Sequence, residues 1–335
     1  MSLPPILQDL RLPVIGSPLF IVSNPDLVLA QCKAGIVGSF PALNARETDG
    51  EPIELERWLK RITEELDRHN QANPDRPAAP YAVNQIVHRT NVRLERDIEI
   101  CARWKVPIWI TSLGARVEVN EAAHSCGGIT LHDVINDRFA RKAIEKGADG
   151  LIAVAAGAGG HAGSLSPFAL IQEIRSWFDG PLALSGAIAC GGSILAAQAA
   201  GADLAYIGSA FIATEEANAA EGYKRMIVDC GADDIVYTNL FTGVLGNYLK
   251  PSVAAQGMDP ENLPTSDASA MTFASGSSKP KSWKEIWGSG QGIGAVRDVV
   301  PAAALIDRLD REYRAAQRRL AATLAGQTRQ VPQVA

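Results

Sequence analysis

The sequence lacks the cysteine pattern of a disulfide-bonded or zinc-binding protein. Its 335 residues include five cysteines, an odd number, and no two of them form a CxxC pair. They stand far apart in the chain, at Cys32, Cys101, Cys126, Cys190 and Cys230. This scattering argues against a disulfide framework and a zinc site, and it is typical of the reducing cytoplasm, where we expect the protein to act.

A long apolar run, a leader and a metal motif are also missing. No stretch of about 18 uninterrupted apolar residues occurs, so no membrane span is predicted. The first residues, "MSLPPILQDLRLPVIG", show no basic region followed by an apolar one, which argues against a signal peptide. There is no HExxH, no cysteine–histidine cluster and no carboxylate triad, so we expect no catalytic metal.

The charge balance excludes further partners. The formal net charge is −5 and no basic stripe is present, so we expect no nucleic acid and no membrane surface as partner. Hydrophobic residues make up 47% of the chain, enough for a large core. We expect a small-molecule enzyme and leave a homodimer open as its assembly state.

Eight short apolar runs follow one another in the first two-thirds of the chain. Each is apolar nearly throughout, as expected for parallel strands that are covered on both faces. The predicted strands are Pro13–Ser17, Gly35–Phe40, Tyr81–Ile86, Pro107–Ser112, Gly128–Asp133, Gly150–Ala155, Leu182–Gly186 and Ala205–Ser209. Helical patterns lie between them, and the first opens with Asn24 as N-cap and Pro25 at the first helical position.

Eight such units in series predict an α/β fold, a (β/α)8 TIM barrel, rather than an open doubly wound sheet. The eighth helix is expected near Glu215, and a stretch rich in Gly, Ser, Pro and aromatic residues follows it. We predict the barrel over residues 1–220 and about 300–326, ending in an amphipathic helix. A smaller second domain, or lid, is predicted over 221–299, inserted after strand eight, and a loose tail over 327–335.

Small residues follow the seventh and eighth strands, where barrels commonly bind phosphate. Strand seven ends in "LSGAIACGGS" and strand eight in "YIGSAF". The backbone N–H groups expected to face a phosphate belong to Ser185, Gly186, Ala187, Gly191, Gly192, Gly208 and Ser209. Glycines that only make tight turns are the alternative, but two clusters at neighbouring strands favour phosphate binding.

Polar residues stand at two other strand ends. Asn84, in "YAVNQI", is a candidate partner for a polar ring system, and hydrogen bonding to neighbouring backbone is the alternative. His132 and Asp133 end the fifth strand in "LHDV". They either line the site or form a capping or structural pair.

One histidine stands in a glycine-crowded loop after the sixth strand, "AAGAGGHAGSLSP". Glycine is costly to order, so such a cluster indicates a sharp bend or a close approach of the backbone to something. An imidazole at the catalytic face can act as a base or donate a hydrogen bond to an anion. We predict a functional role for His161 and surface positions for His69, His88 and His124.

Together these segments resemble the nitronate monooxygenases, formerly called 2-nitropropane dioxygenases. The resemblance rests on "LPVIGSPLF", "VNQ", "LHDV", "GAGGHAG", the strand seven-to-eight block and "GSGQGIG", and it covers roughly Leu12 to Leu320. It implies an FMN-containing barrel that oxidises alkyl nitronates with O2 to a carbonyl compound and nitrite. In such an enzyme His161 would stabilise the anionic substrate, or abstract an α-proton from a neutral nitroalkane or related carbon acid.

The resemblance also implies how FMN would be held. The phosphate would bind at the turns after strands seven and eight, while the first-strand loop, Asn84 and Gly160 would contact the ring, and a second domain would close over the site. The predicted cofactor-binding residues are Ser17, Pro18, Leu19, Asn84, His132, Gly160, Ser185, Gly186, Ala187, Gly208, Ser209, Gln291 and Gly292. Leu19 replaces a frequent methionine, Asp133 stands where many relatives carry lysine, and "SGAI" replaces the commoner "SGGI".

Other functions stay open beside this one. An FMN-dependent NAD(P)H:quinone or enoyl-thioester reductase could use the same scaffold, because such enzymes bind NADH against the flavin without a separate fingerprint. A flavin-free aldolase or isomerase is disfavoured, since no lysine stands at a strand end to form a Schiff base. Chemistry of the IMP dehydrogenase type needs a cysteine after the sixth strand, and none is there.

Overall fold

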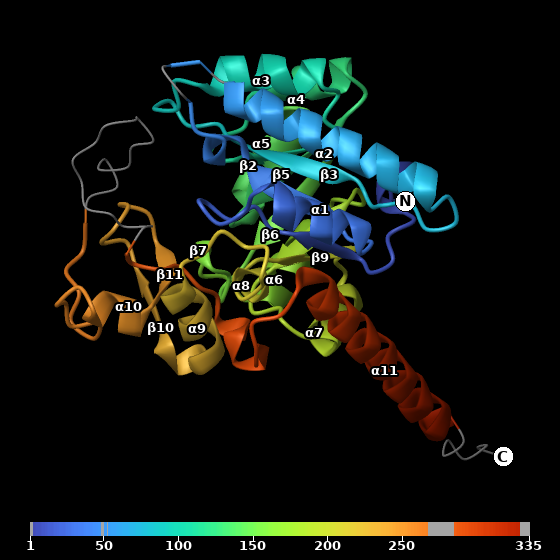
Figure 1. Ribbon diagram of the computed structural model, residues 1–335. Coiled ribbons are helices and arrows are strands. Elements are labelled where there is room, and N and C mark those ends of the chain that lie inside the picture. Colours follow the sequence, from blue (N-terminus) through green and yellow to red (C-terminus); the bar gives the residue numbers. More distant parts are fainter. Residues whose placement is uncertain (1–2, 48–49, 52, 267–284, 329–335) are drawn as a thin grey trace.

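The computed structural model describes residues 3–47, 50–51, 53–266 and 285–328. Part of the predicted second domain, residues 267–284, and most of the predicted tail, residues 329–335, lie outside this range. Figure 1 shows a central ring of strands surrounded by helices, with a smaller group of elements at one side.

Eight parallel strands form one sheet in the order β1-β9-β8-β6-β5-β4-β3-β2. A parallel bridge between Ile15 and Val37 joins the first strand to the second and closes the ring. The strands are β1 (Val14–Gly16), β2 (Gly38–Pro41), β3 (Tyr81–Ile86), β4 (Ile108–Ser112), β5 (Ile129–Val134), β6 (Gly150–Val154), β8 (Leu182–Ser185) and β9 (Leu204–Ile207). The predicted TIM barrel is confirmed.

The first of the helices around the barrel begins where local sequence signals predict a helix start. Asn24 caps the first helix by accepting a hydrogen bond from the N–H of Leu27 at 2.9 Å, and Pro25 takes the first helical position, as predicted. The outer helices are α1 (Pro25–Lys33), α2 (Ile53–Ala72), α3 (Leu94–Arg103), α4 (Val117–Ser125), α5 (Asp137–Glu145), α6 (Pro167–Arg175), α7 (Gly191–Ala200) and α11 (Ala302–Thr328).

The prediction of an eighth helix near Glu215 is wrong. Thr214 forms a bridge with Val300, and the N–H of Glu215 donates to the carbonyl of Val300 at 3.1 Å. The side chain of Glu216 accepts from the N–H of Ala302 at 2.9 Å and so caps α11. These acidic residues therefore serve the start of a helix more than eighty positions later, and α11 packs against α7 and α1 in the eighth place of the ring.

Apolar side chains fill the inside of the barrel. Ile15, Ile110, Leu131 and Ile152 belong to one buried cluster with Tyr206, contributed by strands around the ring. Because side chains alternate along a strand, the residues between them face the helices. The barrel is thus a packed core, and a cavity opens at the carboxyl ends of its strands.

A second group of elements follows β9. It comprises α8 (Ser209–Ile212), α9 (Glu221–Asp229), β10 (Ile235–Thr238), β11 (Gly246–Leu249) and α10 (Lys250–Ala254). Elsewhere and within this group, short 3-10 turns lie at Pro5–Leu7, Ala42–Asn44, Ala232–Asp234 and Gln291–Ala295. The sheet of this group has the strand order β10-β11-β7. The third strand, β7 (Gly160–His161), lies in the loop after β6 and pairs with β11. The division into barrel, second domain and tail stays a prediction.

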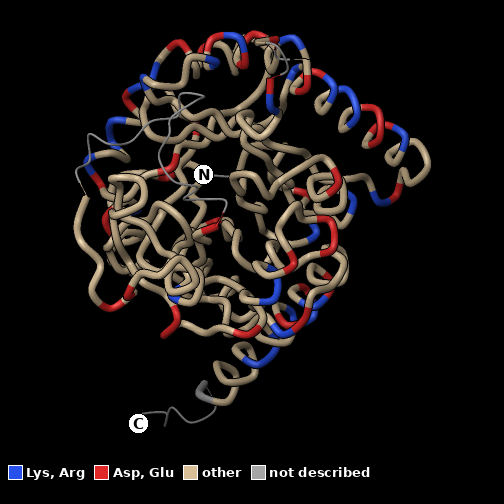
Figure 2. The backbone as a smooth tube through the Cα atoms, turned by 60° about the vertical axis from the view of Figure 1, so that its left-hand side comes forward, with Lys and Arg blue, Asp and Glu red and all other residues tan. Residues whose placement is uncertain are grey.

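The charged residues lie mostly on the outer helices, as Figure 2 shows. Among the helices that the structure describes, none is both long and apolar enough to cross a membrane.

Candidate active site

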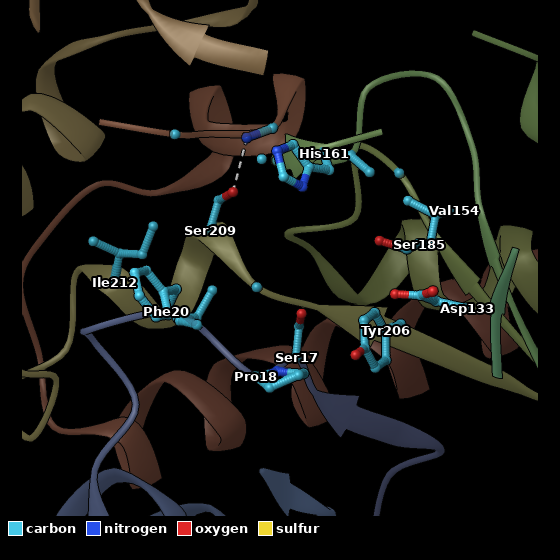
Figure 3. Close-up of a pocket in the computed structure, with 18 of the residues that line it drawn as sticks. Ser17, Pro18, Phe20, Asp133, Val154, His161, Ser185, Tyr206, Ser209 and Ile212 are labelled. Carbon is cyan, nitrogen blue, oxygen red and sulfur yellow. Dashed lines mark hydrogen bonds between the residues drawn. The ribbon is translucent and has the colours of Figure 1, made fainter. Parts of the chain in front are cut away.

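A cavity opens at the carboxyl ends of the barrel strands (Figure 3). It takes backbone and side chains from the ends of most barrel strands and from the segment before α11. Most of the predicted site residues line it, namely Ser17, Pro18, Leu19, Asn84, Gly160, His161, Ser185, Gly186, Ala187, Gly208, Ser209 and Gly292. The fold therefore gathers in one place residues that span most of the chain.

His132 and Gln291, both predicted to contact the cofactor, do not line the cavity. His132 points away from it because Leu131 and Asp133, its neighbours on β5, point inward. Its Nδ1 lies 2.6 Å from Thr111 Oγ1, and burial lowers the pKa of His132 to about 4. Gln291 lies against Gly157 and donates its backbone N–H to that residue's carbonyl at 2.9 Å. The structure thus gives His132 and Gln291 packing contacts behind the cavity wall.

His161 stands at the cavity in a short strand that the sequence did not predict. It pairs with Gly246 in the antiparallel register of β7 and β11. Its Nε2 lies 2.8 Å from the Oγ1 of Thr242, which comes from the loop between β10 and β11. Burial lowers the pKa of His161 to about 4, so the imidazole is neutral near pH 7. A neutral imidazole can accept a proton or donate one hydrogen bond.

Bare backbone forms one wall of the cavity. A Cβ on Gly159 would lie 2.8 Å from the nitrogen of Gly290 and 2.9 Å from Ser209 Oγ, closer than real Cβ contacts allow. The N–H of Gly290 donates to Ser209 Oγ at 2.8 Å, the bond drawn in Figure 3. Glycine is therefore required here so that the loop after β6 can lie against the segment before α11.

The turn after β8 differs from our phosphate prediction. Gly191 and Gly192 do not line the cavity, and the N–H of Gly191 donates to Glu312 Oε2 of α11 at 2.8 Å. A Cβ there would overlap the backbone of Tyr313, at 2.0 Å from its nitrogen. This glycine thus serves helix packing. The N–H of Ala187 is also engaged, since it donates to the carbonyl of Gly157 at 3.2 Å.

Polar groups form the base of the cavity. Asn84 donates from Nδ2 to Ser112 Oγ at 2.8 Å and to the carbonyl of Ile110 at 3.1 Å, so its amide oxygen keeps acceptor capacity. Beside it, burial raises the pKa of Asp133 to about 6, although hydrogen bonds from Ser112 and the N–H of Leu113 oppose this shift. Figure 3 shows Asp133 and Tyr206 side by side.

The ionisable carboxyl in the cavity lining, Asp133, has no lysine or arginine beside it among the lining residues that the structure describes. Sequence reasoning left open whether Asp133 lines the site, and it missed Ser112, Tyr206 and Thr242. Alternation along β5 puts Asp133 on the same face as Leu131 and His132 on the opposite face, but the sequence does not tell which face lines the cavity, and nothing in it signals Thr242.

The fold and the cavity define the class: an α/β-barrel enzyme with its site at the carboxyl ends of the strands. The chain belongs to the nitronate monooxygenase family, whose sequence profile matches residues 6–312. It is 26% identical to the nitronate monooxygenase of Paraburkholderia phytofirmans over 90% of this chain and 92% of that one. The protein is thus an oxidoreductase of the nitronate monooxygenase type.

Solved structures share the fold. FabK from Thermotoga maritima matches with a TM-score of 0.75 and 22% identity, covering 95% of this chain and 97% of its own. The nitroalkane oxidase from Streptomyces ansochromogenes matches with a TM-score of 0.70 and 23% identity, covering 92% of this chain and 97% of its own.

Proposed function

We propose that this protein uses FMN to oxidise alkyl nitronates with O2 to a carbonyl compound and nitrite, in the cytoplasm. The observation that carries the proposal is a neutral histidine held at a cavity with a glycine-rich wall, in a chain of the nitronate monooxygenase family. A single imidazole and a cofactor suffice for this chemistry. Among the described residues no cluster of His, Cys, Asp or Glu could hold a metal ion.

The residues present fit a flavin. The main chain at Gly159 and Gly160 lines the cavity, so a flat ring would lie against backbone there. The amide oxygen of Asn84 would accept from a ring N–H, and the main chain at Gly186 and Gly208 would approach the phosphate. When bound, FMN supplies the electron transfer to O2, while the protein supplies binding and orientation.

His161 would act on the substrate in one of two ways. As a hydrogen-bond donor it would hold the nitro oxygens of a nitronate. As a base it would remove the α-proton of a neutral nitroalkane, which its neutral form near pH 7 permits. Both roles place the reacting carbon next to the ring, and both are lost when the imidazole is removed.

The test is His161→Ala with His124→Ala as control, because His124 lies on the surface, 2.8 Å from Asp149. We expect His161→Ala to keep FMN bound and to lose about 10²–10⁴-fold in turnover of ethyl nitronate, the range of one general acid–base group. His124→Ala should match the wild type. Unchanged turnover of His161→Ala would contradict the assigned role.

A second experiment separates the reductase alternative. The purified protein is mixed without oxygen with ethyl nitronate or with NADH, and the flavin absorbance is followed. Bleaching by nitronate supports the proposal. Rapid bleaching by NADH with none by nitronate would favour the quinone or enoyl-thioester reductase, and a colourless protein would refute both.

A further inference from the structure

The loop between β10 and β11 brings a hydroxyl to the catalytic candidate. Thr242 Oγ1 lies 2.8 Å from His161 Nε2, although the two residues are 81 positions apart. The pairing of Gly246 with His161 sets this distance, because the loop ends where β11 begins to pair with β7. The contact is therefore built into the sheet register.

The loop itself is well braced. The N–H of Gly243 donates to the carbonyl of Asn239 at 2.8 Å, and the ring of Phe241 packs edge-on against the buried Tyr248 at 4.9 Å between centroids. Tyr237, on β10, donates from its hydroxyl to the carbonyl of Ala162 at 2.8 Å, next to His161. A hydroxyl on such a loop can fix the orientation of the ring that it contacts.

The contact between Thr242 and His161 allows a hydrogen bond in either direction, and the bond from Thr242 to the Val244 carbonyl favours one of them. The Thr242 hydroxyl has one proton, and it donates to the carbonyl of Val244 at 3.1 Å. With that proton on the Val244 carbonyl, the bond to His161 runs from Nε2–H to the Thr242 oxygen, a direction that the 2.8 Å distance permits as well as its reverse.

We propose that Thr242 is a positioning residue that holds the His161 ring and fixes its Nε2–H tautomer, so that Nδ1 is the basic nitrogen. Of the two roles proposed for His161, this tautomer fits removal of the α-proton and not donation to a nitronate, because the single N–H faces Thr242. The inference rests on the proposed function only for its kinetic consequence. When Nδ1 takes up a proton, the Nε2–H bond to Thr242 stays in place and becomes charge-assisted, so the ring need not turn during turnover.

The test compares Thr242→Val, which removes the hydroxyl at nearly constant volume, with Thr242→Ser, which keeps it. On nitroethane, whose α-proton Nδ1 would remove, we expect the FMN-loaded Thr242→Val protein to lose about 5–10-fold in kcat, the effect of one hydrogen bond. KM should change by less than about twofold, because no substrate contact is removed, and Thr242→Ser should recover the wild-type kcat. Equal losses in both variants would indicate a merely structural role and overturn the proposal.

A readout without substrate decides the tautomer. The chain has five histidines, so ¹⁵N-histidine spectra of the holoenzyme are simple, and the His161→Ala spectrum identifies the His161 signals. At pH 7 we expect a protonated Nε2 and an unprotonated Nδ1 in the wild type and in Thr242→Ser, and a mixture of tautomers in Thr242→Val. A protonated Nδ1 in the wild type, or no change in Thr242→Val, would refute the proposal.

The two proposals can fail separately. If the wild type shows the expected tautomer but does not oxidise nitronate, the proposed function is wrong and the positioning role stands. If nitronate is oxidised but the tautomer is unchanged by Thr242→Val, the positioning role is wrong and the proposed function stands.

Discussion

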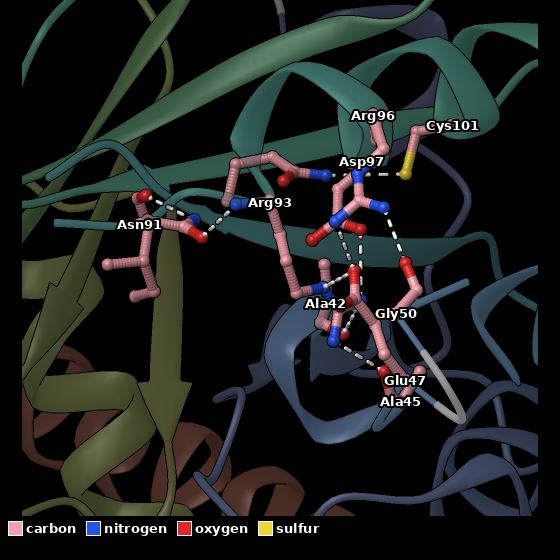
Figure 4. A network of polar contacts seen from close by, with 11 residues as sticks. Ala42, Ala45, Glu47, Gly50, Asn91, Arg93, Arg96, Asp97 and Cys101 are labelled. Atoms are coloured by element: carbon pink, nitrogen blue, oxygen red, sulfur yellow. Dashed lines mark hydrogen bonds and ion pairs between the residues drawn. The ribbon is translucent and has the colours of Figure 1, made fainter. Parts of the chain in front are cut away.

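Burial raises the pKa of two carboxyl groups, Asp97 and Asp133, to about 6. One belongs to a buried ion pair and the other faces the cavity. Asp97 lies on α3 and is completely buried, 2.9 Å from the guanidinium of Arg93 (Figure 4). Asp133 lies at the base of the cavity, where its partners are a hydroxyl and a backbone N–H. A shifted pKa therefore reports burial, and a site needs open space beside the group.

The network around Arg93 lies within the protein, and in it Asp97 Oδ2 is buried without a hydrogen-bond partner among the described residues. Arg93 donates to the carbonyl of Ala45 at 2.7 Å and also pairs with Glu47 at 3.2 Å. It thereby fixes the turn at Ala42–Asn44 onto α3. In the same turn, Asn44 holds the cavity loop, accepting from the N–H of Ile21 at 2.9 Å and donating to the carbonyl of Leu19 at 2.9 Å. This network supports the site from outside.

The largest expected effect is on the network. Asp97→Ala should lower the free energy of unfolding by about 3–5 kcal/mol, because it leaves the buried Arg93 charge without its closest carboxylate. Urea unfolding measures this. Asp229→Ala is the control, since its pair with Arg225 is exposed and is worth about 0.3–0.5 kcal/mol. A loss below 1 kcal/mol for Asp97→Ala would contradict the conclusion that Asp97 stabilises the fold through its buried pair with Arg93.

The next effect is on the cavity wall. Gly159→Ala should displace the segment at Gly290, at a cost of about 1–3 kcal/mol, and should weaken FMN binding by about tenfold. Fluorescence titration of the apoprotein with FMN measures the affinity. Gly231→Ala is the matched control, because a Cβ there meets nothing within 4 Å. Equal affinity in both variants would show that the wall does not border the cofactor.

The smallest effect is on Asp133 and depends on pH. Its folded-state pKa of about 6 lies above the ordinary value of 3.8, so folding is penalised where the carboxyl is ionised in both states, above about pH 6. Asp133→Asn should therefore raise the free energy of unfolding by about 1–2 kcal/mol at pH 8. The gain should vanish as the pH falls from 6 to 4, where the folded carboxyl is protonated. Thermal melts at pH 4.5 and pH 8 check this, and a gain at pH 4.5 alone would refute the assignment.

Strands and caps were predictable because their signals are local. The strand Tyr81–Ile86 was predicted with both bounds, and Asn24 was predicted as the N-cap of α1, where it accepts from the N–H of Leu27. The helix expected near Glu215 is absent because this segment instead contacts the start of α11, where Glu216 accepts from the N–H of Ala302, and local sequence does not reveal such a distant partner. Gly191 was misread for the same reason, since its partner Glu312 comes from α11.

The order of the strands, their parallel pairing and the loop that carries His161 follow from the hydrophobic pattern and the glycine spacing, which act over a few residues. Contacts between segments that are distant in the chain determine the details of the site. That Asp133 faces the cavity while His132 faces the helices depends on how β5 is seated in the ring, and the contact of Thr242 with His161 depends on the register of a second sheet. Packing between residues far apart in the chain sets such contacts, and no local pattern encodes them.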